Sequence, residues 1–383
     1  MTTEKTGKIF TRDFILVFFA QVAFTVVGYI LIPTLPVYLA RLGSKETEIG
    51  VLIGSYGVSS LVFRPFVGRA LLRRAAKTFM FMGALLSALT SAAYLFAPPF
   101  LPFLAVRVFQ GIGLAFFNTA VFTLVANISP EIHRGQSLSY FFLAQNVSLA
   151  LAPPLGMLII NHFSFSLLFL VCLGVSLSAL FITSELGTRQ ILQAVDSSNE
   201  DGSFLNLKAL PPSIISFFFY FLWGALATFF PLYAISHRVS NPGFFFTALS
   251  IILFLGRAFG GRILDLYSKE KLIVYFFSIC ILSVVSLAFS KTLPSFILAG
   301  VIWGIGASFF NPAIMSYTLD RAGSSSRGPA MGTYTACSDL GLSLGPAVMG
   351  SIIPLTGYPV MFLILGLIGV INLVYFHFFV RGR

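Results

Sequence analysis

Apolar residues run through this chain in stretches of about 20, and short polar segments separate the stretches. Each stretch is long enough to cross ~30 Å of hydrocarbon as a helix. None alternates apolar and polar residues as the strands of a membrane barrel do. We therefore predict an all-α membrane protein with twelve transmembrane helices. Their predicted limits are residues 14–38, 48–70, 78–98, 101–124, 137–160, 165–185, 212–235, 244–264, 271–290, 294–318, 331–353 and 359–380.

The two halves of the chain repeat one another at a constant offset of 193 residues. RPFVGR at 64–69 falls on RAFGGR at 257–262, and QGIGLAFFN at 110–118 falls on WGIGASFFN at 303–311. Such self-similarity indicates a duplicated six-helix unit, and an even number of spans in each copy makes them parallel repeats. The predicted domains are an N-terminal six-helix bundle at 1–185, a polar cytoplasmic linker at 186–211 and a C-terminal six-helix bundle at 212–383.

The composition agrees with this topology, because 57% of the residues are hydrophobic and only 10% are charged, against roughly 25% in soluble domains. The 24 Lys and Arg residues outnumber the 13 Asp and Glu residues, which gives a net charge of +11. With both termini inside, 17 of these 24 basic residues lie in cytoplasmic segments, as the positive-inside rule requires. The excess charge therefore reflects orientation and indicates no nucleic-acid partner. We expect a monomeric, multi-pass protein of the inner (plasma) membrane with both termini cytoplasmic.

No pattern of catalytic or metal-binding residues appears. The chain has no phosphate-binding P-loop, no HExxH and no GxSxG, and its three cysteines form neither a disulfide framework nor a zinc pattern. We expect no enzyme activity, no metal site and no cofactor. A membrane receptor that transports nothing, or an intramembrane enzyme, is disfavoured because no nucleophile–base pair, metal cluster or extramembrane domain is present.

One acidic residue, Asp339, falls well inside a predicted span. A charge at the bilayer centre costs ~2.5–3.5 kcal/mol, so such residues face a cavity and mark a site. Its repeat equivalent is Asn146, so the fold itself does not require an acid here. A carboxyl group away from water favours its neutral form, which suits a proton-coupling site. The alternative is a structural aspartate that is hydrogen-bonded to a neighbouring helix.

Arg107 is the corresponding basic residue, and its repeat equivalent is Gly300. Gln110 and Asn118 follow it along one face of the same predicted helix, which indicates the wall of a cavity. We predict that Arg107 and Asp339 face one central cavity from opposite halves. The alternative is an arginine that reaches outward to the lipid headgroups.

Further residues are candidates for this cavity because they are polar, or aromatic with a polar handle. The substrate-cavity candidates are Gln21, Gln110, Asn118, Asn146, Trp303, Asn311 and Tyr334, with Trp223, Tyr220 and Tyr317 as additional aromatic candidates.

Small residues and prolines recur at matching positions of the fifth and eleventh predicted spans. Gly341 and Gly345 form a GxxxG pair, which allows close approach of a neighbouring backbone, and Pro346 follows directly. The first half has Pro153 at the position of Pro346. We predict that these two spans pack closely against neighbouring helices, and in the fold that the resemblance given below implies they line the contact between the halves and take part in gating.

These motifs resemble those of the major facilitator superfamily, and in particular its twelve-span drug and metabolite efflux branch. GRALLRRAAK at 68–77 resembles the family's Gly-x-x-x-Asp-Arg-x-Gly-Arg-Arg loop motif, and RVFQG at 107–111 its Arg-x-x-Gln-Gly motif. APPLG at 152–156 resembles the Gly-Pro-x-x-Gly antiporter motif in altered form. The resemblance covers the whole chain, and it implies that Arg107 and Gln110 participate in proton transfer.

One departure from the family pattern concerns the gate. The first loop has Leu72 where the family has Asp, whereas the second copy keeps an acid, Asp265. By the pseudo-symmetry of the halves, Asp265 is expected to approach the start of the fifth span near Arg134. The predicted gating residues are Arg69, Arg73, Arg134, Pro153, Arg262, Asp265, Gly341, Gly345 and Pro346.

The resemblance implies a secondary transporter that exports a small amphipathic or weakly polar molecule in exchange for protons, by rocking one bundle against the other. The main alternative is an uptake permease or uniporter for a sugar, an organic acid or another metabolite. A sodium-linked carrier stays open as well, because Asp339 with backbone carbonyls near Pro346 offers oxygen ligands for a cation.

Overall fold

The computed structural model describes residues 10–71, 73–98, 100–129, 134–187, 206–259, 266–322 and 327–381, and no strand occurs among them. The helices of the first half are α1 (Arg12–Arg41), α2 (Glu46–Leu71), α3 (Ala76–Ala93), α4 (Leu101–Ile128), α5 (Arg134–His162) and α6 (Phe165–Ser184). Those of the second half are α7 (Leu210–Ser236), α8 (Gly243–Phe259), α10 (Lys269–Phe289), α11 (Leu293–Ala322), α12 (Arg327–Tyr375) and the π-helix η3 (Phe376–Val380).

The last two predicted spans share one element, α12. Gly357 interrupts it with a non-helical backbone (φ 79°, ψ 169°), so two helical arms meet at a kink there. By length and composition, 10 of the described helices can cross a membrane, and Gly243–Gly256 adds a shorter apolar helix. The all-α class is confirmed, whereas a count of twelve requires that the two arms of α12 be taken as separate helices.

Local sequence sets several helix starts. The side chain of Thr11 accepts a hydrogen bond from the Phe14 amide at the start of α1, and Ser164 accepts one from Leu167 at the start of α6, both at 3.2 Å. These caps satisfy amide groups that have no partner within the helix. Pro65, Pro153, Pro231 and Pro346 lie inside helices, where each removes one backbone hydrogen bond.

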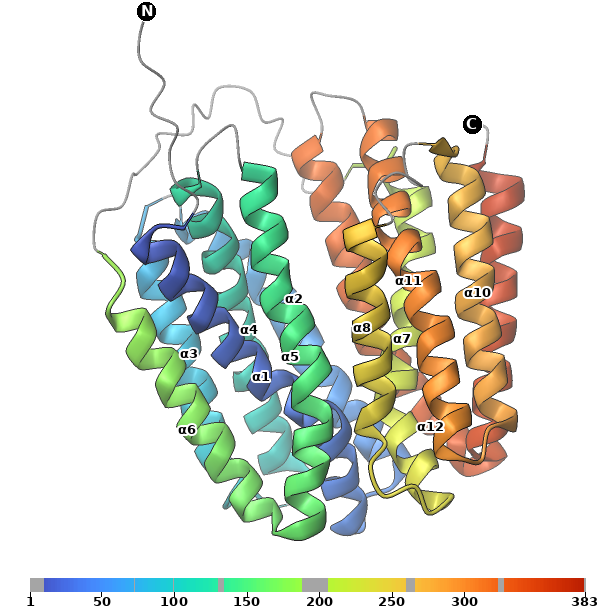
Figure 1. The fold of residues 1–383 in the computed structure, drawn as a ribbon, viewed down its shortest axis with the longest axis horizontal. Helices are drawn as coiled ribbons and strands as arrows, with labels where there is room; N and C mark the ends of the chain where they lie inside the picture. Colours follow the sequence, from blue (N-terminus) through green and yellow to red (C-terminus); the bar gives the residue numbers. More distant parts are fainter. Residues whose placement is uncertain are drawn as a thin grey trace, which may run out of the picture.

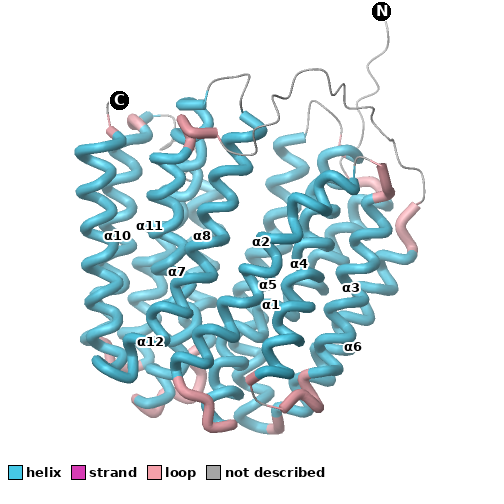
Figure 2. The backbone as a smooth tube through the Cα atoms, turned by 180° about the vertical axis from the view of Figure 1, so that it is seen from behind, coloured by secondary structure: helices cyan, strands magenta, loops and turns pink. Residues whose placement is uncertain are grey.

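The helices form two bundles, α1 to α6 and α7 to η3 (Figures 1 and 2). We call the end where α1 begins and η3 finishes the termini end, and the opposite end the far end. The bundles meet at the far end and spread apart toward the termini end (Figure 1). The linker predicted at 186–211 lies for the most part outside the described residues.

At the far end, α2 packs closely against α12. A Cβ atom at Gly50 would lie 2.2 Å from the carbonyl oxygen of Pro346, and one at Gly54 would lie 2.3 Å from that of Ser343. The Thr47 hydroxyl donates to the Gly350 carbonyl at 3.1 Å. The glycines of α2 therefore allow the two backbones to touch across the bundle interface.

The GxxxG pair of α12 has a different neighbour from the predicted one. A Cβ at Gly341 would lie 2.0 Å from the Phe217 carbonyl oxygen, and one at Gly345 would lie 2.2 Å from that of Phe221. Both carbonyls belong to α7 of the same bundle. These glycines thus bring α7 and α12 together within the second bundle, because α12 turns its glycine face inward and its Pro346 carbonyl toward α2.

A second inter-bundle contact at the far end joins α5 to α8. The Asn241 amide donates to the Pro154 carbonyl at 3.1 Å, and the Thr247 hydroxyl donates to the Ala150 carbonyl at 2.7 Å. Pro153 lies in the same contact, because a Cβ at Gly243 would approach its carbonyl carbon to 2.7 Å. Both α5 and α12 therefore line the contact between the halves.

Candidate functional site

A cavity of about 430 Å³ lies between the two bundles. Its walls come from α1 to α5 of the first bundle, with Ser87 as the contribution of α3, and from α7 and α12 of the second. Three charged side chains line it, namely Arg64, Arg107 and Asp339. The size falls within the ~300–1,000 Å³ typical of small-molecule sites.

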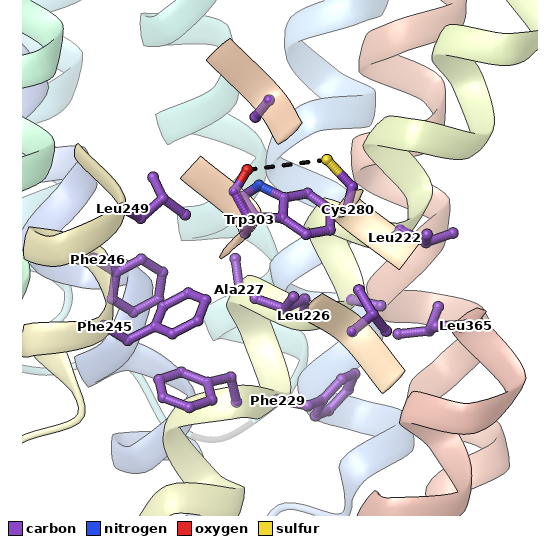
Figure 3. Packing of buried hydrophobic residues seen from close by; sticks show 14 of the residues in the cluster. Leu222, Leu226, Ala227, Phe229, Phe245, Phe246, Leu249, Cys280, Trp303 and Leu365 are labelled. Carbon is purple, nitrogen blue, oxygen red and sulfur yellow. Dashed lines mark hydrogen bonds between the residues drawn. The ribbon is translucent and has the colours of Figure 1, made fainter. Parts of the chain in front are cut away.

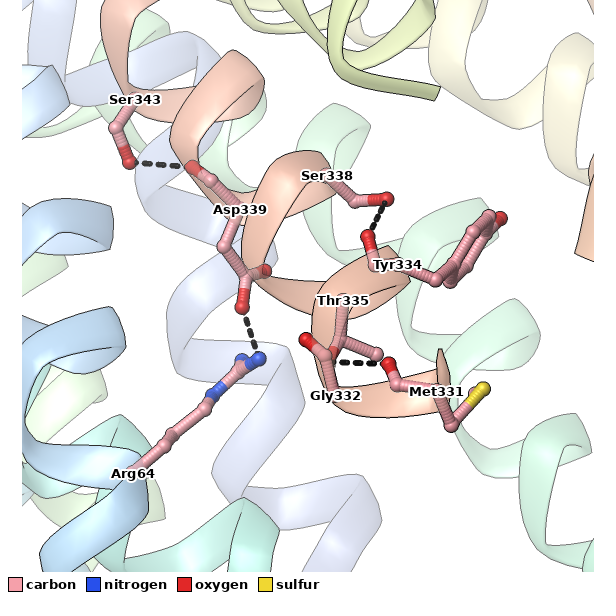
Figure 4. Close-up of polar contacts among 8 residues, drawn as sticks. All are labelled: Arg64, Met331, Gly332, Tyr334, Thr335, Ser338, Asp339 and Ser343. Carbon is pink, nitrogen blue, oxygen red and sulfur yellow. Dashed lines mark hydrogen bonds and ion pairs between the residues drawn. The ribbon is translucent and has the colours of Figure 1, made fainter. Parts of the chain in front are cut away.

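Asp339 forms an ion pair with Arg64 of the other bundle (Figure 4). One guanidinium nitrogen of Arg64 donates to Oδ2 of the carboxylate. The side chains are 31% and 20% exposed, respectively, so the pair is reachable from the cavity. The structure thus gives the intramembrane acid a cationic partner, and that partner belongs to α2 rather than α4.

Arg107 makes its described contacts within the first bundle. Its guanidinium donates to the carbonyls of Leu52 and Ile53 at 3.1 and 3.2 Å, and to Gln110 Oε1 at 2.6 Å. The guanidinium carbon lies 4.6 Å from the centre of the Tyr56 ring. These contacts hold the cation in place and supply dipoles, but no described carboxylate neutralises it.

A buried tyrosine fixes the orientation of the Gln110 amide. The Tyr94 hydroxyl donates to Gln110 Oε1 at 2.5 Å, and Tyr94 is 0% exposed. The amide oxygen therefore receives two donors, from Tyr94 and Arg107. These two hydrogen bonds link Tyr94, Gln110 and Arg107 and hold the Arg107 guanidinium in position.

The two charged regions of the cavity lie at different depths. Arg107 is level with Leu52 and Ile53, because it bonds to their carbonyls. Arg64 lies eleven to twelve residues further along the same helix, which corresponds to about 16 to 18 Å along the axis. Arg107 therefore marks the far end of the cavity, and the Arg64–Asp339 pair marks its termini end.

The structure separates the predicted cavity residues into two sets. Gln110 and Asn118 line the cavity, and so do Tyr220 and Trp223 among the additional aromatic candidates. The described lining does not include Gln21, Asn146, Trp303, Asn311, Tyr334 or Tyr317. Helical facing explains most of this difference, since a shift of one residue turns a side chain by about 100°. Gln145, next to Asn146, is the α5 amide that reaches the cavity.

Several of the residues outside the lining are buried in packing. Trp303 is 2% exposed and lies within the core of the second bundle (Figure 3). Its ring stacks on those of Phe219 and Trp223, with ring centroids 5.4 and 5.6 Å apart. The ring of Tyr334 points away from the Arg64–Asp339 pair (Figure 4). Gln21 is fully buried, and neither polar atom of its side chain has a described partner.

The predicted gating residues are only partly visible. Arg69 is exposed in the last turn of α2, and Arg73 is exposed in the turn that follows. Arg134 begins α5, but its side chain lies outside the description, and so do Arg262 and Asp265 entirely. The predicted approach of Asp265 to Arg134 therefore stays a prediction.

Sequence reasoning missed Arg64 as a site residue. The sequence shows an arginine inside a predicted span, which is a signal of function in a membrane. The repeat pattern alone gives Arg64 a place in the sequence but no role in the site. Among the described residues, no three His, Cys, Asp or Glu side chains gather as ligands for a metal ion.

Two helical bundles with a charged cavity between them define a membrane transport protein. The model of the Major Facilitator Superfamily matches residues 17–328 and again 213–383, so the chain belongs to this family. The staphylopine export protein of Staphylococcus aureus is 27% identical over 352 residues, which span 87% of each chain. The quinolone resistance protein NorA of the same species is 24% identical over 356 residues, with 88% and 89% covered.

Solved structures support the same fold. The nucleoside transporter NupG superposes with a TM-score of 0.79 at 15% identity, covering 97% of this chain and 100% of that one. A bacterial homologue of the lysosomal transporter Spinster, solved in an inward-facing conformation, gives 0.75 at 13% identity with 95% of each chain covered. The protein is therefore a multi-pass membrane transporter with efflux relatives, and not an enzyme.

Proposed function

We propose that this protein exports a small amphipathic or weakly polar molecule in exchange for protons, with Asp339 as the group that binds the exchanged proton. The observation that carries the proposal is the ion pair between Asp339 and Arg64, which joins the two bundles inside the cavity. The staphylopine exporter and NorA, both similar over most of the chain, favour efflux as the direction.

The ion pair links protonation to movement. A proton on Asp339 removes the charge that attracts Arg64, so α2 and α12 lose an ionic contact between the bundles. The loss of this contact between the bundles changes the relative stability of their two arrangements. Arg107 lies on α4 at the level of Leu52 and Ile53, about 16 to 18 Å from Arg64 along the axis of α2, which is too far to share that proton directly. We therefore assign coupling to Asp339 with Arg64.

We place the protein in the plasma membrane with both termini cytoplasmic, on the basis of the positive-inside bias. In that orientation the far end is the outer side. The contacts of α2 with α12 and of α5 with α8 then close the outer side, and the bundles spread toward the cytoplasm. This is the state in which an exporter takes up its cargo.

The test uses purified protein in proteoliposomes with an imposed pH gradient. A panel of quinolones, metal-chelating amino-acid derivatives, nucleosides and sugars is screened for gradient-driven accumulation. We expect Asp339→Asn to lower this accumulation about tenfold or more, while exchange of labelled for unlabelled substrate without a gradient continues. Asp320→Asn removes an acid that pairs with Lys269 outside the cavity and serves as the matched control.

Full gradient-driven accumulation by the Asp339→Asn protein would show that Asp339 does not bind the exchanged proton and has a structural role only. Accumulation driven by a sodium gradient, or flux with no gradient dependence, would instead indicate a sodium-linked carrier or a uniporter. Direction follows from whether an inside-acid gradient drives substrate into vesicles or out of them.

A further inference from the structure

The charges in the cavity do not cancel. Among the described lining residues, Arg64 and Arg107 each carry a positive charge and Asp339 carries a negative one. Asp339 neutralises Arg64, and this leaves the Arg107 guanidinium as an uncompensated cation at the far end of the cavity. A buried charge without a counter-ion is costly, so a ligand that supplies an anion there is favoured.

Arg107 has donors to spare for such a ligand. A guanidinium group has five N–H donors in a planar fork, and the described contacts of Arg107 occupy three of them. The protein acceptors hold the group in a fixed orientation. The remaining N–H groups can therefore bind a carboxylate with little loss of side-chain freedom.

The termini end of the cavity has the opposite preference. Asp339 uses Oδ2 for Arg64, and its Oδ1 has no described partner. Asn118 Oδ1 is also buried without a described partner, and it lies at the level of Arg64, since Gly111 packs against the Tyr56 carbonyl seven residues earlier on α4. Two oxygen acceptors at this end of the cavity favour a ligand group that donates hydrogen bonds, such as an amine.

Aromatic and apolar side chains cover the wall between these ends. Tyr29, Tyr56, Tyr220 and Trp223 line the cavity, and Phe24 faces it as well. Aromatic walls bind flat, apolar ring systems and stabilise cations at their faces. A ligand that fills this space has an aromatic body between two polar ends.

We infer that the cavity takes an amphipathic zwitterion, with its carboxylate on Arg107 at the far end and its amine toward Asp339 and Asn118 at the termini end. The carboxylate contact is independent of the transport mechanism. The placement of the amine rests on the proposed function, because a substrate cation next to Asp339 favours release of the proton from the carboxyl group, as exchange of substrate for protons requires.

The test compares two probes that differ only in charge at one end. A piperazinyl quinolone carboxylic acid and its primary amide are titrated calorimetrically into the purified protein without a gradient. We expect the parent protein to bind the acid about tenfold more tightly or better, the gain typical of a charge-assisted hydrogen bond. Arg107→Gln removes this preference because it lowers the affinity for the acid. Arg107→Lys retains part of the preference, because the cation remains.

Arg41→Gln is the matched control, since it removes an exposed arginine that lies over Phe165 outside the cavity. Equal affinity of the parent protein for acid and amide, binding of neither probe, or a preference that survives in Arg107→Gln overturns the inference. An acid preference together with no pH-driven flux leaves the inference standing and removes the proposed exchange mechanism. Equal pH-driven flux of acid and amide overturns the inference and leaves the proposed exchange mechanism standing.

Discussion

Two arginines on neighbouring helices have different partners, and their roles differ for that reason. Arg64 contacts a carboxylate of the other bundle, so its contact depends on how the bundles are arranged. Arg107 contacts two carbonyls and an amide of its own bundle, so its position is set whichever way the bundles move. Arg64 is therefore suited to coupling protonation to the movement of the bundles, and Arg107 is suited to holding a ligand.

A double-mutant cycle on Arg64 and Asp339 tests the first role. Arg64→Gln leaves the acid without its cation, and Asp339→Asn leaves the cation without its acid, so each is expected to lower pH-driven flux about tenfold or more. Because the residues act as a pair, the double variant should lose little more than either single variant. Losses that multiply in the double variant would show that the two residues act independently.

The sequence identified Asp339 because an intramembrane acid stands out against an apolar background, and the repeat shows that the fold does not need it. The partner of Asp339 could not be read in the same way. More than one arginine lies in a predicted span, Arg64 and Arg107 among them, and only the packing of α2 against α12 pairs Asp339 with Arg64. The polar handle of Trp303 predicts a place in the cavity, but a neighbouring ring, that of Trp223, lines the cavity instead and stacks on Trp303.

At the scale of elements, glycines allow close helix contacts of two kinds, one between the bundles and one within the second bundle. Gly54 of α2 meets the Ser343 carbonyl of the other bundle, whereas Gly345 of α12 meets the Phe221 carbonyl of its own bundle. The sequence shows small residues at both places and predicts close approach. It does not show which neighbour approaches, since that depends on the rotation of each helix about its axis.

Substituting these glycines separates the two kinds of contact. A methyl group at Gly54 overlaps α12 only while the far end is closed, so Gly54→Ala should disfavour that state by about 1–3 kcal/mol, or fivefold or more in population. Gly345→Ala strains the second bundle in both states and should instead lower its thermal stability. The population is followed by the rate at which a short bifunctional thiol reagent joins Asn161→Cys to Ser240→Cys, since the Asn161 amide donates to the Ser240 carbonyl at 2.6 Å.

Gly174→Ala provides the control, because nothing lies within 4 Å of a Cβ at that position. It should change neither the cross-linking rate nor the stability. An unchanged cross-linking rate in Gly54→Ala would mean that α2 and α12 do not separate at the far end. The three native cysteines, of which Cys172 and Cys280 are buried, are replaced beforehand in every variant.

For the whole molecule, the sequence was sufficient to predict the helical fold and the two related halves, because apolar length and internal repetition are properties of the chain alone. The conformational state is a different kind of property. The hydrogen bonds from Thr247 to Ala150 and from Thr47 to Gly350 close the far end in this structure. Each joins a segment of one half to a segment of the other, and the internal repeat does not show which segments are in contact. A transporter occupies at least two arrangements of the same halves, and one sequence encodes both.

If transport requires the far end to open, a bridge across that end must stop it. With Asn161→Cys and Ser240→Cys joined by a cleavable reagent, we expect flux to fall to background and to return when the bridge is reduced. The matched control joins Lys77→Cys to Ser184→Cys inside the first bundle, where the Lys77 amine donates to the Ser184 carbonyl at 2.7 Å. That bridge moves with its bundle and should leave flux unchanged. Full flux through a completely bridged far end would require a pathway other than the one between the bundles, because the contacts of α5 with α8 cannot then separate.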